Sequence, residues 1–219
     1  MPDETHAGLR LDAVRILLDG RELLAVDSHV RPGETLTVMG PSGSGKSTLL
    51  AYIGGFLDPV FQSSGRVLCG GRDIIALPAQ ERHAGILFQD ALLFPHMSVG
   101  GNLVFALPDS VKGKAARRAR AEAALADVGL EDFFDRDPDT LSGGQKARVA
   151  LARVLLAEPN FLLLDEPFSK LDMRLRDQIR DLVFERALRS RLPVILVTHD
   201  EADAKAAGGT VIEIGTGAP

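Results

Sequence analysis

Short apolar runs alternate with segments of helical spacing over most of this chain. Two apolar stretches between residues 9 and 30 are separated by Asp19 and Gly20, which predicts an antiparallel hairpin. Further strand-length runs lie at residues 34–39, 65–69, 85–88, 161–164, 194–197 and 210–214. Helical patterns follow several of them, at residues 47–54, behind Ser142, and at 173–189. Strands that alternate with helices predict an α/β fold with a mostly parallel, covered core sheet and an N-terminal antiparallel β subdomain.

The middle of the chain differs from this pattern. Residues from about 95 to 155 are rich in alanine, leucine and arginine with helical spacing, and we expect them to form an α-helical subdomain inserted into one domain that spans residues 1–219. We expect no C-terminal regulatory domain. The basic run KGKAARRAR, residues 112–120, is expected to be a solvated helix face. Nucleic-acid binding is the alternative, which one short basic run in an acidic protein supports poorly.

Composition and charge exclude several classes of protein. The hydrophobic fraction of 45% and the charged fraction of 25% are ordinary for a globular domain. The net charge of -5 argues against a nucleic-acid partner. Cys69 is the only cysteine, so no intramolecular disulfide can form and a reducing compartment is expected. The aliphatic runs are far shorter than the roughly 20 residues needed to cross a bilayer.

A glycine-rich loop follows the strand predicted at residues 34–39. It fits the pattern G-x-x-x-x-G-K-[ST] between a strand and a helix, and comprises Gly40, Pro41, Ser42, Gly43, Ser44, Gly45, Lys46, Ser47 and Thr48. The glycines let backbone amides surround phosphate, Lys46 can reach the terminal phosphates, and the Ser47 hydroxyl can bind Mg²⁺. The alternative is an ordinary glycine turn with a solvated lysine.

Polar residues end three of the predicted strands. Asp165 and Glu166 follow the strand at 161–164, in the place where parallel sheets bind ligands, and suit Mg²⁺ binding and the positioning of a water. His199 follows the strand at 194–197 and could contact phosphoryl oxygens or orient Glu166. Gln89 could bind Mg²⁺ or hold the water. Taken one at a time, each is also consistent with a strand-ending turn, a surface residue or a polar loop.

A second anion-binding end is predicted at residues 142–145. Ser142 can cap the helix that follows, and Gly143 and Gly144 leave its backbone amides open to an anion, next to Gln145. The chain therefore carries two phosphate-binding ends.

The order GPSGSGKST, Gln89, LSGGQ, LLLDE, SKLD and VTHD resembles the ATP-binding subunits of ABC transporters, and the likeness spans nearly the whole chain. It implies a P-loop NTPase that binds ATP and Mg²⁺ and forms a head-to-tail homodimer when ATP binds. In that arrangement residues 142–145 would contact the partner's nucleotide. The resemblance further implies Glu166 as general base, Lys46 on the phosphates, Ser47, Gln89 and Asp165 at Mg²⁺, His199 and Gln89 as sensors, and Asp172 as a coupling residue across the dimer.

The stretch DALLFPHMSVGGN resembles importers, in which this region receives a membrane subunit. The resemblance implies permease subunits bound through the region from Gln89 to Val99, a periplasmic binding protein acting through the permease, and a peripheral place on the cytoplasmic face of a bacterial inner membrane. Alternatively, Leu92, Leu93, Phe94 and Met97 simply pack the helical subdomain. The sequence segments ILFQDALLF and DPDTLSGGQKARVAL resemble those of YnjD-like subunits. An exporter or lipoprotein-release ATPase, and a soluble cassette ATPase acting on nucleic acid or ribosomes, are the alternatives.

One departure from the family pattern concerns the base of the nucleotide. The family usually stacks adenine on an aromatic residue near the end of the first strand, where this chain has Leu17 and Leu18. We therefore expect weaker or less base-selective nucleotide binding. We also expect a monomer when no nucleotide is bound.

Overall fold

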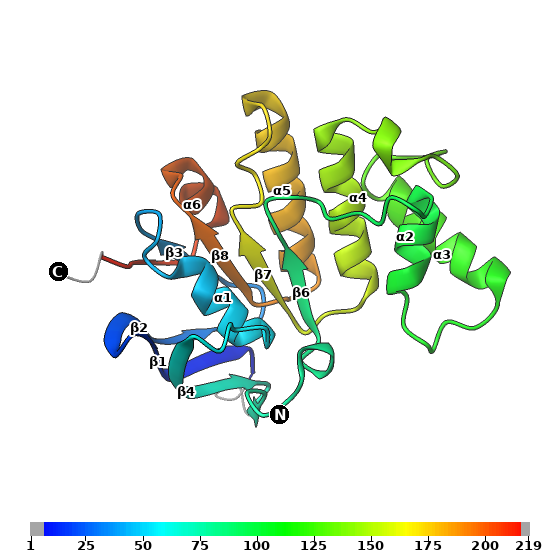
Figure 1. Cartoon of the computed structure of the whole chain (residues 1–219). Helices are drawn as coiled ribbons and strands as arrows, with labels where there is room; N and C mark the ends of the chain where they lie inside the picture. Colours follow the sequence, from blue (N-terminus) through cyan, green and yellow to red (C-terminus); the bar gives the residue numbers. More distant parts are fainter. Residues whose placement is uncertain (1–6, 216–219) are drawn as a thin grey trace. The chain divides into compact units, whose positions relative to one another are not determined.

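A computed structural model describes residues 7–215 of the chain (Figure 1). These residues form two compact units, which are described separately below. The first combines residues 7–86, Asn160–Glu166 and residues 184–215; the second combines Leu87–Pro159 and Pro167–Val183.

The five-stranded core sheet has the strand order β6-β7-β8-β3-β9. Its strands are β6 (Ala84–Leu87), β7 (Phe161–Asp165), β8 (Val194–Thr198), β3 (Thr35–Met39) and β9 (Thr210–Glu213). The pairs β3–β8, β3–β9 and β7–β8 are parallel. All five residues of β8 and the first four of β7 are buried, which explains why these strands read as continuous apolar runs. Two helices follow strands of this sheet: α1 (Lys46–Gly54) comes after β3, and α6 (Glu201–Ala207) after β8.

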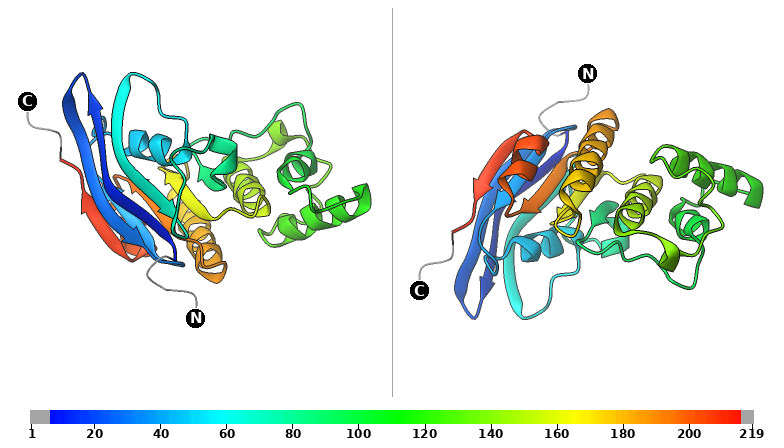
Figure 2. Two further views of the ribbon diagram at one scale, coloured as in Figure 1. Left: turned by 90° about the horizontal axis from the view of Figure 1, so that it is seen from below. Right: turned by 90° about the horizontal axis from the view of Figure 1, so that it is seen from above.

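A second, antiparallel sheet has the order β2-β1-β4-β5. It is built from β1 (Leu9–Leu18), β2 (Arg21–Val30), β4 (Phe61–Cys69) and β5 (Arg72–Asp73), and Figure 2 shows the first three side by side. The strand predicted at residues 65–69 begins earlier, at Phe61. Its first half is mostly polar and exposed, so apolar patterning could not reveal it. Pairing with β1 brings Phe61 opposite Leu18.

The core of the first unit joins residues from both sheets and α1. It includes Leu11 and Ile16 of β1, Val38 of β3, Ile53 of α1 and Ile195 of β8, all of which are fully buried. A buried arginine closes the end of α1. Arg82 donates hydrogen bonds to four backbone carbonyls, those of Tyr52, Ile53, Ile75 and Leu77. Two of these carbonyls belong to the last turn of α1: that of Tyr52 also accepts from the Gly55 amide, and that of Ile53 accepts from Arg82.

The second unit is helical. It contains α2 (Val99–Ala106), α3 (Lys114–Ala126), the short 3₁₀ turn η3 (Pro138–Thr140), α4 (Gly143–Leu156) and the first part of α5 (Met173–Arg189); another 3₁₀ turn, η2 (Ala79–Glu81), lies in the first unit. The core of this second unit includes Val99, Leu103, Ala121, Leu125 and Val149.

The basic run at residues 112–120 has partners inside the second unit. Arg117 donates to backbone carbonyls, including those of Val104 and Val111. Arg118 pairs with Glu122 and Asp135, and Arg120 pairs with Glu158. Much of the positive charge in this run therefore holds the α3 region together.

Between residues 7 and 215, no helix has both the length and the apolar character required to cross a bilayer.

Candidate nucleotide-binding site

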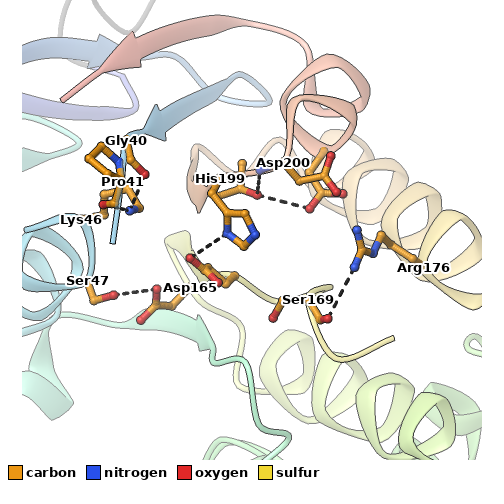
Figure 3. Close-up of polar contacts among 12 residues, drawn as sticks. Gly40, Pro41, Lys46, Ser47, Asp165, Ser169, Arg176, His199 and Asp200 are labelled. Atoms are coloured by element: carbon orange, nitrogen blue, oxygen red, sulfur yellow. Dashed lines mark hydrogen bonds and ion pairs between the residues drawn. The ribbon is translucent and has the colours of Figure 1, made fainter. Parts of the chain in front are cut away.

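The glycine-rich loop connects β3 to α1 and surrounds the Lys46 side chain. Lys46 is 6% exposed, and its Nζ donates to the carbonyl oxygens of Gly40 and Pro41, both at 2.8 Å (Figure 3). Helix α1 starts after Gly45, which has a φ of 88° and provides no side-chain cap, and the first turn contains no acid. The amides at the start of α1 are thus available to an anion at the positive end of the helix dipole.

Three glycines shape this loop in different ways. At Gly40 an added Cβ would lie 2.4 Å from the carbonyl oxygen of Ile214, and at Gly45 it would lie 2.8 Å from the Leu23 side chain. At Gly43, where φ is 81°, nothing lies within 4 Å. The loop is therefore packed behind Gly40 and Gly45 but open at Gly43, as a surface that admits a phosphate requires.

Ser44 gives a second indication that this loop fits a phosphate. Its hydroxyl is buried and has no hydrogen-bond partner among the described residues. A buried hydroxyl without a partner is costly unless something outside the chain satisfies it. The Ser44 hydroxyl, the uncapped α1 amides and the Lys46 ammonium together form a donor set that matches a polyphosphate.

Asp165 lies beside the loop, at the carboxyl end of β7. Its Oδ1 accepts a hydrogen bond from the Ser47 hydroxyl at 2.9 Å (Figure 3). Burial raises the pKa of Asp165 most strongly and the neighbouring Glu166 raises it further, while Ser47 and Lys46 lower it. A serine hydroxyl and a carboxylate oxygen are hard ligands of the kind that Mg²⁺ takes beside phosphates, so the residues present fit this cation.

Glu166 and His199 form a contact next to Asp165. Nδ1 of His199 lies 3.1 Å from Oε1 of Glu166, and the two side chains are 63% and 26% exposed, respectively. The Glu166 backbone has a φ of 45°, in the left-handed region that non-glycine residues seldom adopt. Its amide donates to the Val197 carbonyl, which holds this turn against β8. Backbone strain of this kind concentrates at functional sites.

Gln89 lies in the second unit, where it lines a cavity of about 130 Å³. Gly143 and Lys146 of α4 line the same cavity, together with Phe168 and Lys170 of the loop after β7. The structure thus brings Gln89 close to the start of α4, and Lys170 pairs with the adjacent Asp90 at 2.5 Å.

The second predicted anion site is the start of α4. Ser142 and Gln145 cap each other: the Ser142 hydroxyl accepts from the Gln145 amide, and the Gln145 side chain accepts from the Ser142 amide. This capping box leaves the amides of Gly143 and Gly144 open, and the first turn has no acid. An added Cβ at Gly144 would overlap the Leu175 side chain, so packing inside the unit explains that glycine. Gly143 is exposed and nothing lies within 4 Å of such a Cβ.

Asp172 stands at the start of α5. Its carboxylate accepts a hydrogen bond from the Leu175 amide at 3.0 Å, as a helix cap does. Arg176 of the same helix donates to the carbonyl oxygens of Phe168 and Ser169, which fixes the loop that leads to Asp172.

Sequence reasoning missed two residues that hold the segment after Gln89. Asn102 of α2 is fully buried and binds the backbone of residues 94–98. Arg153 of α4 binds the carbonyl oxygens of Ala91 and Leu92. The only sequence signal for Asn102 is a polar residue within the apolar run VGGNLVFA, and Arg153 resembles any other helical arginine.

Comparisons with known proteins agree with this geometry. Residues 23–169 match the family model described as ABC transporter. The chain is 50% identical over 190 residues to the ABC transporter ATP-binding protein YnjD of Escherichia coli K12, covering 87% of each chain. It is 45% identical over 183 residues to the Fe(3+) ions import ATP-binding protein FbpC of Agrobacterium fabrum, which covers 84% of this chain and 51% of that protein. The chain thus spans about half the length of this iron-import relative.

A solved structure is similar as well. The dimeric, post-hydrolysis ATP-binding cassette MJ0796 bound to ADP and phosphate superposes with a TM-score of 0.78 at 30% identity, over 95% of both chains. The expected α/β P-loop fold, with its parallel core sheet and antiparallel N-terminal sheet, is confirmed. With 50% identity to one curated relative over 190 residues and a family model matched over residues 23–169, this chain belongs to the ABC transporter family, as an ATP-binding and ATP-hydrolysing protein.

Proposed function

We propose that this chain is the ATP-hydrolysing subunit that energises a bacterial ABC importer, by forming a head-to-tail homodimer when ATP binds. The observation that carries the proposal is the open start of α4, where the amides of Gly143 and Gly144 have no side-chain cap. The first unit already contains a phosphate-binding loop with its own helix start. A second helix start with free backbone amides would be functional if it bound the phosphates of a nucleotide held by another copy of the chain.

The free energy that the α4 starts could contribute is large enough to matter for an ATP-driven change from open to closed dimer. A helix start carries about half a positive charge, which stabilises an anion by up to ~2 kcal/mol in a partly buried site. A dimer with two nucleotides would use two α4 starts, or ~4 kcal/mol. Swinging an equilibrium from mostly open to mostly closed takes about 5.5 kcal/mol. The two α4 starts would supply much of it, and the remaining contacts of each nucleotide would supply the rest.

Within one chain, each site residue has a role that its position supports. Lys46, the α1 amides and the Ser44 hydroxyl would hold the phosphates, and Ser47 and Asp165 would hold Mg²⁺. The bound Mg²⁺ would neutralise charge that develops on the terminal phosphate. Glu166 would orient a water and accept its proton.

His199 would act on Glu166. With a proton on Nδ1 the imidazole would donate to Oε1 of Glu166, which would fix the carboxylate and leave the other carboxylate oxygen for the water. To sense the terminal phosphate the ring would have to donate from Nε2 as well, which requires a proton on both ring nitrogens. Gln89 would be the corresponding sensor from the second unit, and Asp172 would couple the two sites of the dimer.

Support for the importer role comes from the region Gln89 to Val99. Leu92 in this region is 57% exposed, and Phe105, whose ring meets Phe94 edge-on at 5.2 Å, is 65% exposed. Contiguous exposed apolar groups are typical of a protein-binding surface, and the contacting rings of Phe94 and Phe105 would form part of one. Permease subunits would bind here and keep the chain on the cytoplasmic face of the membrane, with a periplasmic binding protein acting through the permease. The likeness to an iron importer at 45% identity favours import.

The test compares Glu166→Gln with the double variant Glu166→Gln, Gly143→Asp by size-exclusion chromatography with light scattering, with and without Mg-ATP. We expect Glu166→Gln to form a dimer only with ATP. An acid at the first position of α4 stabilises the helix by about 0.3–1 kcal/mol but repels a nucleotide from the partner. The double variant should therefore melt no lower, bind ATP as well as the parent, and stay monomeric.

The control is Glu166→Gln with Ala115→Asp, because Ala115 is an exposed residue in the first turn of α3, with a helical backbone that aspartate can adopt. This variant should dimerise like the parent. A dimer of Glu166→Gln, Gly143→Asp as stable as the parent dimer would refute the assignment of α4 to the partner's nucleotide.

A further inference from the structure

The turn that follows Gln89 has an unusual backbone. Leu92 has a φ of 44°, in the left-handed region, although it is not a glycine and its side chain is exposed. A leucine in this conformation persists only when its surroundings hold it. Something must therefore fasten the turn formed by residues 90–92.

The fastening comes from α4. One arm of the Arg153 guanidinium donates to the Leu92 carbonyl at 2.8 Å, and the other donates to the Ala91 carbonyl at 3.0 Å. The guanidinium carbon also lies 5.6 Å from the centre of the Phe94 ring. The planar guanidinium directs two separate N–H groups at the two carbonyls in a fixed geometry and lays its face towards the Phe94 ring, a combination that the compact lysine ammonium lacks.

Arg153 is committed to this turn. Burial lowers its pKa, so holding the charge there is costly. Within residues 7–215 it has no carboxylate partner, and its hydrogen bonds go to the two carbonyls. An arginine placed only for helix stability would gain more from water or from an acid on its own helix.

The other end of the same helix is the proposed partner-nucleotide site. Arg153 lies in the last turn of α4, whose first residue is Gly143. At 1.5 Å per residue the two are about 15 Å apart along a continuous helix. A second link, the ion pair between Lys170 and Asp90, ties the turn to the loop that precedes Asp172. The turn is thus attached to both elements expected to act on the partner copy.

We propose that Arg153 is a positioning residue that connects the turn 90–92 to the start of α4, so that a protein bound on this turn and a nucleotide bound at Gly143 influence each other through the helix. The inference rests on the proposed function, because it needs the α4 start to meet a nucleotide. The coupling is reciprocal: dimerisation driven by ATP must change the affinity of the turn for a bound protein by the same factor by which that protein changes dimerisation, so the turn must differ between monomer and dimer.

Reciprocity allows a test without the permease. The parent chain carries Glu166→Gln, Cys69→Ser and His96→Cys, with a spin label on the single cysteine next to the turn. The label's spectrum is recorded before and after Mg-ATP, in the parent and with either Arg153→Gln or Arg120→Gln added. Arg120 is the matched control, since it is a half-exposed arginine of the same unit, paired with Glu158.

We expect ATP to change the parent spectrum, and the change to fall about fivefold or more in Arg153→Gln, while dimerisation persists by light scattering. Arg120→Gln should respond like the parent. A dimer that forms in Arg153→Gln with an undiminished spectral change would overturn the role of Arg153 and leave the proposed function intact. A parent that forms no dimer would overturn the proposed function and this inference with it.

Folding of the variant is checked separately. If Arg153→Gln melts far below the parent, Arg153→Lys replaces it, because lysine keeps the charge but lacks the planar guanidinium that directs two separate N–H groups at the two carbonyls. Its spectral change should then lie between that of the parent and the diminished change expected of Arg153→Gln. A full response in Arg153→Lys would count against the need for the two-pronged contact.

Discussion

Asn102 offers the sharpest test of how residues 94–98, which follow the turn 90–92, are held in place. Its Oδ1 accepts from the Phe94 amide at 2.7 Å, and its Nδ2 donates to the carbonyls of Phe94 and Ser98 at 3.1 and 3.0 Å, with a longer contact to Met97 at 3.4 Å. The side chain is fully buried. The substitution Asn102→Asp keeps its size and shape but replaces the donating NH₂ group with an oxygen that faces those carbonyls.

The expected loss of stability follows from these contacts. Two good hydrogen bonds disappear, each contributing about 1 kcal/mol, and each leaves a carbonyl facing an oxygen, which adds about 1 kcal/mol more in total. We expect the free energy of unfolding to fall by about 3 kcal/mol. For a chain of this size, 1 kcal/mol shifts the melting temperature by about 2–4 °C, so the transition should drop by about 6–12 °C.

The loss should depend on pH in a way that a packing defect would not. Carbonyl oxygens and burial disfavour the charged form, so the introduced carboxyl should have a raised pKa in the folded chain. A carboxyl with a raised folded pKa weakens the fold once the pH exceeds the pKa of the unfolded chain, near 4, and the loss is complete above the folded pKa. The defect of Asn102→Asp should therefore shrink as the pH falls from 7 towards about 4.5.

The assay is thermal unfolding followed by circular dichroism at several pH values, with Asn102→Leu as the uncharged comparison. Asn102→Leu should be destabilised by a similar amount that does not vary with pH beyond the parent's own trend. A melting temperature of Asn102→Asp within about 2 °C of the parent at pH 7 would refute the reasoning, as would equal pH profiles for the two variants.

Three further predictions concern the first unit. Arg82→Met should lower the free energy of unfolding by about 3 kcal/mol, because four buried hydrogen bonds to carbonyls are lost. The substitution Arg72→Met, at an exposed arginine, should change this free energy by no more than about 0.5 kcal/mol, and urea titration measures both variants. Burial raises the pKa of the Cys69 thiol, so less thiolate is present at neutral pH and alkylation by iodoacetamide should be slower than for a free cysteine, until urea equalises the two. Leu18→Tyr should tighten binding of a fluorescent ATP analogue by about tenfold through stacking on the base, and equal affinities would count against the missing aromatic as the cause of weak binding.

The sequence was sufficient to predict elements whose signal is local. The hairpin around Asp19 and Gly20, the buried strands β7 and β8 and the helix that begins behind Ser142 all follow from turn residues, apolar runs or capping chemistry within a few positions. The strands of the core sheet and their mostly parallel pairing were predicted by the alternation of strands and helices, whereas the short strand β5 of the antiparallel sheet was not predicted. The positions of Ser47 and Asp165 are consistent with this, since Asp165 is the last residue of β7 and Ser47 lies in the first turn of α1, the helix that follows β3.

What escaped prediction depends on contacts between distant parts of the chain. The start of β4 at Phe61 is set by pairing with β1, which no pattern in QSSG reveals. The left-handed turns at Leu92 and Glu166 carry no glycine to signal them. Arg153 lies far along the chain from the turn that it holds, and its spacing from other residues says nothing of the two carbonyls it binds. These features are determined by tertiary contacts between elements rather than by the local sequence.

The order of strands in the core sheet also has a consequence for biosynthesis. β3, which leads into the nucleotide loop, lies between β8 and β9 and pairs with Val194 to Thr198 on one side and with Thr210 to Glu213 on the other. A ribosome releases β3 long before either neighbour, so its apolar residues have no sheet partner during most of translation. Such long-range pairing is slow and leaves apolar surface open to aggregation. We therefore expect the nucleotide loop to become ordered only after the last strands have emerged, and the nascent chain to depend on chaperones until then.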